Sequence, residues 1–176
     1  MTAEEIFSKI SVTMIEGLMF HAQMAEYYMF LGLPGYSKCH KEHYLEESCS
    51  FSKINCYYIK KFNKLLPEAR AEDPEAIPAG WRKYSRTDVD MNTKRNAVKS
   101  GIEKWVAWES KVLKIYEQMY QEAIEIGEIA AACEIKKLIK DVAHELEKAQ
   151  QYHLNRRSTD YDMSYIVEEQ KKEELD

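Results

Sequence analysis

The stretch SGIEKWVAWESKVLKIYEQMYQEA, residues 100 to 123, decides how this chain folds. At about 100° per residue, its apolar side chains fall on one stripe of an α-helix. The stripe consists of Ile102, Trp105, Val106, Leu113, Tyr116, Tyr120 and Ala123. Glu109 falls near the centre of the stripe, where a carboxylate must be paired, hydrogen-bonded, protonated or bound to a metal because an isolated buried charge is costly. We therefore expect Glu109 to face polar groups on other helices.

The composition limits the classes of protein that the chain can belong to. A length of 176 residues suits one domain, and six glycines and four prolines beside many Glu, Lys and Ala residues are typical of a helical protein. The net charge of −5 and the lack of a large basic block argue against nucleic acid as a partner. The N-terminus lacks a signal-peptide pattern, and no apolar run reaches membrane-spanning length. We expect a cytoplasmic protein without a membrane partner.

Two long helices are predicted before the opening stretch. The first covers about 3–32 and ends at Leu33-Pro34-Gly35, and the second covers about 36–65 and ends before Pro67. Because about three residues join them, we expect antiparallel neighbours. Their apolar stripes also contain polar side chains that a core does not require. These are Glu16 in the first helix, and His40 and Glu47 in the second.

The segment 66–91 interrupts the helical pattern with three prolines and a mixture of charges. So long a connection needs a reason, and a bundle whose second and third helices run parallel requires such a crossover. Trp81 and Tyr84 could fix this segment to the bundle surface or to another subunit. Two further helices follow at about 92–126 and 128–155, separated by a tight break at Gly127, and Glu145 lies along the edge of the last stripe.

The sequence thus predicts an all-α four-helix bundle over residues 1–155, with one long crossover between the second and third helices. Residues 156–176 form a C-terminal tail that could hold a short helix. Each helix of the bundle carries one glutamate at or near its buried stripe, namely Glu16, Glu47, Glu109 and Glu145. A glutamate directed inward from each helix is half of what a carboxylate-bridged site for two Fe or Mn ions requires.

The helix order, the crossover and the two tight turns resemble the ferritin-like superfamily over about 3–155. The stretch WVAWESKVLKIYEQMYQEAIEIGEIAAACEIKKLIKDVAHELEKA is similar to the third and fourth helices of bacterioferritin-like proteins. GYSKCHKEHYLEE is similar to the start of the second helix in mini-ferritins. The resemblance implies that Glu16, Glu47 and Glu109 occupy the ligand positions of the first three helices.

The chain departs from the ligand pattern of that family on two helices. Ser50 stands where the Glu-x-x-His motif that begins at Glu47 would have histidine. On the fourth helix, one register places Val142 and Glu145 at the glutamate and histidine positions, and the other places Asp141 and His144 there. The candidate metal ligands are Glu16, His40, Glu47, Glu109, Asp141, His144 and Glu145.

Two functions follow from these observations, and the sequence leaves both open. The first is a ferritin-like protein that binds one or two Fe or Mn ions and could oxidise or store iron. The second is a ferritin-like bundle without metal chemistry that acts as an oligomeric or partner-binding scaffold. In either case Tyr57, Trp81 and Trp108, which lie off the inner stripes, favour a homo-oligomer.

Overall fold

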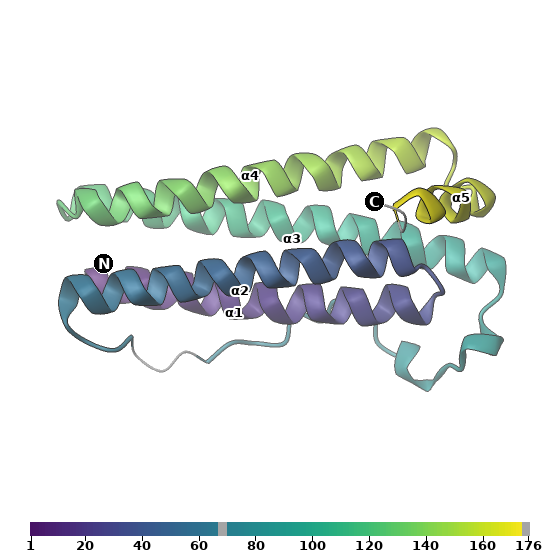
Figure 1. The fold of residues 1–176 in the computed structure, drawn as a ribbon, viewed down its shortest axis with the longest axis horizontal. Coiled ribbons are helices and arrows are strands. Elements are labelled where there is room, and N and C mark those ends of the chain that lie inside the picture. Colours follow the sequence, from purple (N-terminus) through teal and green to yellow (C-terminus); the bar gives the residue numbers. More distant parts are fainter. Residues whose placement is uncertain (67–69, 174–176) are drawn as a thin grey trace.

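The computed structural model describes residues 1–66 and 70–173 and contains five α-helices and two short 3₁₀ turns (Figure 1). The α-helices are α1 (Ala3–Phe30), α2 (Pro34–Phe62), α3 (Met91–Glu125), α4 (Ile129–Ser158) and α5 (Met163–Glu173). The 3₁₀ turns are η1 (Trp81–Lys83) and η2 (Arg86–Asp88). No strand occurs within the described residues, so the prediction of an all-α bundle is confirmed.

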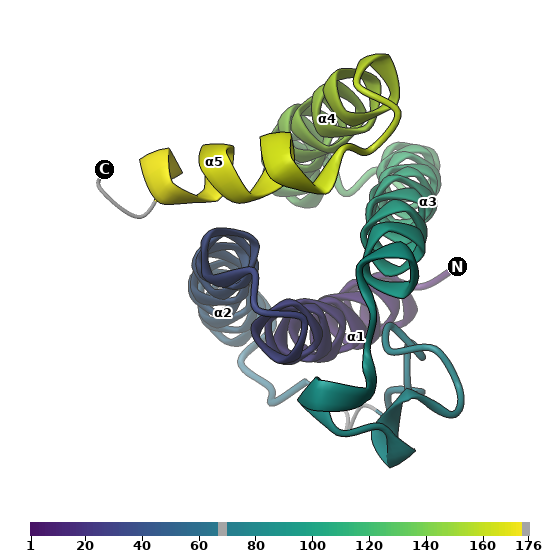
Figure 2. The ribbon, with the colours of Figure 1, turned by 90° about the vertical axis from the view of Figure 1, so that its right-hand side faces the viewer.

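The bundle consists of two helical hairpins, α1 with α2 and α3 with α4, which meet along α1 and α3. Figure 2 shows the four long helices end-on, with α2 and α4 on the side where the two hairpins do not pack closely against each other. The shorter helix α5 lies across one end, next to α2. This arrangement leaves the α2–α4 side as the open side of the bundle.

Local sequence explains where the helices begin and end. Thr2 caps α1 by accepting from the backbone N–H of Glu5, while the Glu5 carboxylate accepts from the backbone N–H of Thr2. Gly32 has a φ of 77°, which allows the chain to turn before Pro34 starts α2. Asp90 caps α3 through the backbone N–H of Thr93.

The crossover between α2 and α3 packs along α1. Trp81 lies edge-on to Tyr27 and Phe30, with ring centroids 5.3 and 6.2 Å apart. Gln23 of α1 donates to the Asp73 carboxylate and accepts from the backbone N–H of Ala76. The crossover therefore covers one face of α1. Pro67, the predicted end of the second helix, lies outside the described residues, and α2 already ends at Phe62.

The C-terminal helix α5 is attached through a buried arginine at the end of α4. Arg156 is 1% exposed, donates from Nε to the Tyr36 hydroxyl and forms an ion pair with Glu169 of α5. The backbone N–H of Tyr36 donates to Gln170 Oε1 at 2.8 Å. These contacts join the start of α2, the end of α4 and α5, so the predicted tail packs on the bundle.

Candidate metal centre

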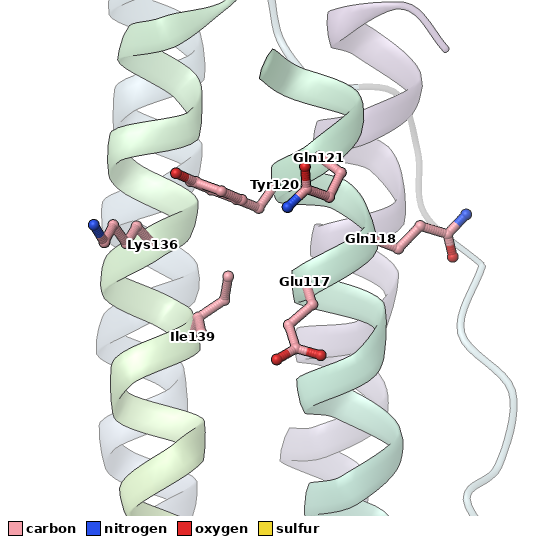
Figure 3. A pocket seen from close by; sticks show the side chains of 6 residues that line it. All are labelled: Glu117, Gln118, Tyr120, Gln121, Lys136 and Ile139. Atoms are coloured by element: carbon pink, nitrogen blue, oxygen red, sulfur yellow. The ribbon is translucent and has the colours of Figure 1, made fainter. Parts of the chain in front are cut away.

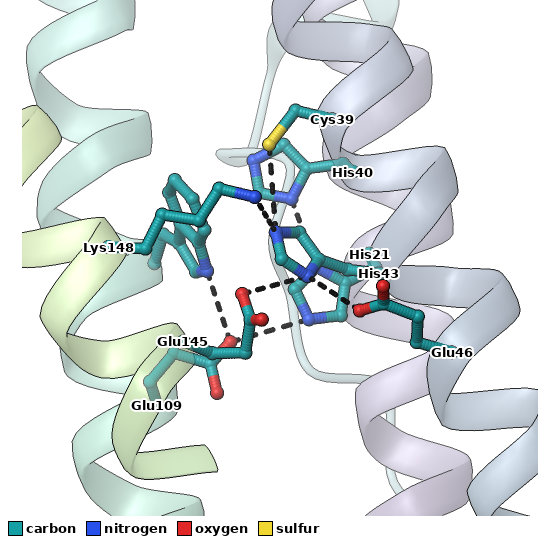
Figure 4. Close-up of polar contacts among 9 residues, drawn as sticks. His21, Cys39, His40, His43, Glu46, Glu109, Glu145 and Lys148 are labelled. Atoms are coloured by element: carbon teal, nitrogen blue, oxygen red, sulfur yellow. Dashed lines mark hydrogen bonds and ion pairs between the residues drawn. The ribbon is translucent and has the colours of Figure 1, made fainter. Parts of the chain in front are cut away.

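Polar side chains from all four long helices meet in the middle of the bundle. Figure 4 shows the histidines of α1 and α2 facing the carboxylates of α3 and α4. The members of this centre are His21 of α1, His43 and Glu47 of α2, Glu109 of α3 and Glu145 of α4.

Glu109 is buried, as its place in the apolar stripe predicted, and its side chain is only 3% exposed. Trp105 donates from Nε1 to Glu109 Oε1 at 3.1 Å, and His21 Nε2 lies 3.4 Å from the same oxygen. The tryptophan lies one helical turn before the glutamate, so α3 itself orients the carboxylate. Glu109 thus keeps its second oxygen, Oε2, for other groups.

Behind Glu109, two buried histidines form a pair. The Nδ1 atoms of His21 and His40 are 2.9 Å apart, so one ring donates and the other accepts. Burial lowers the pKa of both rings, which keeps them neutral near pH 7. If His21 donates from Nε2 to Glu109, it must accept at Nδ1 from His40. His40, a candidate ligand from the sequence, therefore lies behind His21, stacked on Tyr28.

His43 connects α2 to α4. Its Nδ1 lies 2.9 Å from Glu145 Oε2 and 3.7 Å from Glu46 Oε2, while Cys39 Sγ lies 3.6 Å from its Nε2. Burial opposes the charged form of His43, but the contacts with Cys39 and Glu145 outweigh it and raise the pKa to about 10. His43, Glu46 and Glu145 offer donor atoms within 4.8 Å of one another, which is a spacing suited to one cation.

Glu47 carries the least satisfied carboxylate of the centre. Its Oε2 is buried and has no hydrogen-bond partner among the described residues. Burial, together with the negative charge of Glu109, raises the pKa of Glu47 well above its usual range. Gly17 of α1 makes room for this group, because a Cβ at Gly17 would lie 2.4 Å from Glu47 Oε1. A cation beside Glu47 would remove the cost of burying its charge.

A cleft of about 620 Å³ opens the centre to solvent on the α2–α4 side. Its inner wall includes His21, His43, Glu47 and Glu109. Asp141 and His144, which one register of the sequence offered as ligands, are exposed residues on its α4 wall. The register that places Glu145 inward is the one that the structure adopts.

Glu16 does not lie at this centre, so the prediction that it faces inward is wrong. It lies 3.5 Å from Lys111 Nζ and accepts from the backbone N–H of Glu72 in the crossover. It lines a separate cleft of about 460 Å³. The face of α1 that carries Glu16 is covered by the crossover, whereas the face that carries Gly17 and His21 is directed at the centre.

The sequence does not predict the inward positions of His21 and His43. His21 lies off the predicted stripe that contains Glu16, and His43 lies off the predicted stripe that contains His40 and Glu47. The available signal was a second stripe along α1, with a residue every three or four positions. Its members are Ile10, Met14, Gly17, His21, Met24 and Tyr28, all of which are buried.

Another hollow, of about 510 Å³, lies between α3 and α4 (Figure 3). It is lined by Glu117, Gln118, Tyr120, Gln121, Lys136 and Ile139. Its charged groups are one carboxylate and one ammonium, so it offers no set of metal ligands comparable to the centre.

None of the described helices combines the length and the apolar composition that crossing a bilayer requires. A comparison with protein-family models finds no match, and a comparison with curated proteins finds none either.

Solved structures do match the chain. An open-pore ferritin from Archaeoglobus fulgidus has a TM-score of 0.79 and 16% sequence identity, over 98% of this chain and 96% of that one. A humanized archaeal ferritin has a TM-score of 0.77 and 16% identity, over 98% and 95%. A Rhodobacter capsulatus bacterioferritin, described with a metal-free dinuclear site and haem iron, has a TM-score of 0.71 and 17% identity, over 88% and 85%. The chain therefore has the ferritin-like fold.

Proposed function

We propose that the chain binds iron at the centre of the bundle. The observation that carries this proposal is Glu47, a buried carboxylate without a hydrogen-bond partner for Oε2 among the described residues. It lies close enough to Glu109 and Glu145 for their charges to raise its pKa. Carboxylates and imidazoles directed inward from a bundle are the donor set for iron in such folds, and the ferritin structures that this chain resembles support iron over manganese.

The donor set fits one or two cations. His43, Glu145 and Glu46 would hold one, because their donor atoms lie within 4.8 Å of one another. Glu47 and Glu109, which line the same cleft and lie close enough for the charge of Glu109 to help raise the pKa of Glu47, are the carboxylates that would hold a second one. When bound there, iron supplies the Fe(II)/Fe(III) redox couple, which makes iron oxidation or storage the activity to test.

The histidine missing from the Glu-x-x-His motif has a substitute on the same helix. His43 lies one turn before Glu47, whereas the motif would place histidine at Ser50 after it. Positions four apart share a face of a helix, so His43 and Glu47 are neighbours in the centre. Because a ligating imidazole must be neutral and a ligating carboxylate ionised, metal binding would release protons from His43 and Glu47.

The second candidate function is a scaffold without metal chemistry. It is favoured by the contacts between His21 and Glu109 and between His43 and Glu145, which satisfy several polar groups within the chain. Under either function we propose a homo-oligomer. Exposed apolar side chains such as Leu45, Ile59 and Leu154 support this, because a subunit interface would cover them.

Counting the iron bound per chain separates the two functions. Anaerobic Fe(II) titration by calorimetry, followed by metal analysis after gel filtration, should give one or two irons per wild-type chain. Glu47→Gln and His43→Gln should lower this count, and Asp141→Asn, which alters an exposed residue of the same cleft, should keep it. Wild-type protein that retains no iron would leave the scaffold as the function.

A further inference from the structure

A group of aromatic side chains lies where the crossover meets the end of α1. Tyr27 and Phe30 belong to the last turn of α1, and Trp81 and Tyr84 belong to the crossover at η1. Figure 2 shows the crossover below α1, on the side away from α4, so this group is separate from the candidate metal centre. The four rings line a pocket of about 170 Å³.

The rings of this aromatic pocket lie in different planes. The ring of Trp81 is inclined by 82° to Tyr27 and by 85° to Phe30, with centroids 5.3 and 6.2 Å apart. The ring of Tyr84 is inclined by 56° to Trp81 at 5.5 Å. Aromatic rings carry partial negative charge on their faces, so rings in several planes around one space attract a cation into it. This arrangement is typical of the aromatic cages that recognise quaternary ammonium groups.

Three further features of the lining favour a cation. The pocket lies at the C-terminus of α1, the negative end of the helix dipole, and the last turn of α1 contains no basic residue. The Glu26 carboxylate of the same turn also lines the pocket. The Tyr27 hydroxyl is buried and has no hydrogen-bond partner among the described residues, so its oxygen has uncommitted lone pairs.

Arg82 is the positive charge that the chain itself places in this lining. Its guanidinium lies 3.7 Å from the Glu26 carboxylate, and the two side chains are 67% and 64% exposed. An ion pair so exposed to water is weak. Glu26 is therefore available to a cation that binds against the rings, and Arg82 is a competitor of that cation.

We propose that the aromatic pocket binds a small free molecule with a quaternary ammonium group, for which choline is the probe. The ammonium group lies among the four rings, and Glu26 balances its charge. A volume of about 170 Å³ is below the roughly 300–1,000 Å³ of pockets that hold drug-sized ligands, so it suits a group of this size. The lining contains no residue of the proposed iron site, so the two proposals are independent.

Calorimetric titration of the metal-free protein compares choline with 3,3-dimethylbutanol, in which carbon replaces the nitrogen. The shape is kept and the charge is lost. Choline should bind at least about threefold more tightly, because attraction to the ring faces adds to the burial of its methyl groups. In protein labelled with 5-fluorotryptophan, choline should shift the ¹⁹F signal of Trp81. The signals of Trp105 and Trp108, which lie on α3 outside this lining, should not move.

Substitutions at the rim distinguish a cation site from an anion site. Glu26→Gln should weaken choline binding about two- to fivefold, and Arg82→Gln should strengthen it by a similar factor, because both charges are largely exposed. Glu42→Gln is the matched control, since it removes an exposed charge on α2 that does not line the pocket. Trp81→Leu keeps an apolar side chain and should weaken choline binding about three- to thirtyfold.

A phosphatidylcholine headgroup carries the same ammonium group on a lipid, and vesicle flotation tests this source. The protein should not float with phosphatidylcholine vesicles, because Glu26 repels the adjacent phosphate. Flotation that Trp81→Leu abolishes would overturn the choice of a free molecule and assign the pocket to the headgroup.

Three other results would overturn the proposal itself. One is equal affinity for choline and 3,3-dimethylbutanol, which would reduce the rings to an apolar surface; this comparison uses the wild-type chain and needs no variant. Another is weaker choline binding after Arg82→Gln. The third is an absence of choline binding, or binding that leaves the Trp81 signal unchanged. Because the protein contains no iron in these experiments, their outcome is independent of the iron count that tests the proposed function.

Discussion

Replacing Glu47 by glutamine should stabilise the metal-free protein while it removes iron binding. A buried carboxylate without a partner costs about 1–3 kcal/mol, and a neutral amide of the same shape removes most of that cost. We expect the free energy of unfolding at pH 8 to rise by about 1–2 kcal/mol, which corresponds to a Tm higher by about 2–8 °C for a chain of this size.

The pH dependence has a defined sign. The pKa of Glu47 in the folded chain is raised above its unfolded value, so the wild type loses stability as pH rises from the unfolded pKa toward the folded one. The variant lacks this loss. The difference between the two proteins should therefore grow with pH and vanish in acid below the unfolded pKa of a glutamate.

Urea unfolding followed by circular dichroism at several pH values measures this difference. Asp141→Asn is the matched control, because it removes the charge of an exposed residue of the same cleft. At an Fe(II) concentration 100 times the Kd of the wild type, iron binding should raise the free energy of unfolding of the wild type by about 2.7 kcal/mol. The same concentration should raise that of Glu47→Gln by much less. A variant that is less stable than the wild type at pH 8, or that differs from it in stability by the same amount at every pH, would show that the buried charge of Glu47 does not destabilise the folded chain.

Three further substitutions test individual parts of the centre. Gly17→Ala places a Cβ 2.4 Å from Glu47 Oε1, so the carboxylate must move; Fe(II) titration should show at least a tenfold loss of affinity, and an unchanged Kd would contradict this packing. Ser50→His completes a Glu-x-x-His motif in the cleft lining and should tighten Fe(II) binding in the same titration; weaker binding would exclude a ligand position there. Trp105→Phe removes the hydrogen bond to Glu109, which should lower the free energy of unfolding by about 1–3 kcal/mol in urea denaturation. A smaller loss would show that the contact with His21 is enough to satisfy the Glu109 carboxylate.

The sequence predicted most of the fold because each long helix has an apolar face of its own. The opening stretch placed Glu109 in the core correctly, since only one stripe of α3 is apolar over its whole length. Proline-rich composition identified the crossover, and Gly127 identified the break between α3 and α4, where its φ is 78°. The predicted ends of α1 and α2 differ from the observed ends by two or three residues, as expected where helix ends depend on local capping.

The candidate site was harder to predict because α1 has two partly apolar faces. One face, with Glu16 and Tyr27, packs under the crossover, and the other, with Gly17 and His21, faces the centre. Periodicity cannot distinguish a face covered by a loop from a face covered by helices. The inward histidines of α2 also interrupt its apolar pattern. Such departures from local sequence rules are expected at a functional site.

The proposed iron site lies between α2 and α4 at the level of Glu47, where diffraction can locate a bound ion. A crystal of the protein is soaked anaerobically with Fe(II) and measured on both sides of the iron absorption edge. We expect an anomalous difference peak within coordination distance of His43 and Glu145, with Glu47 or Glu109 as a further ligand. An absent peak, or one confined to the exposed pair Asp141 and His144, would exclude this site.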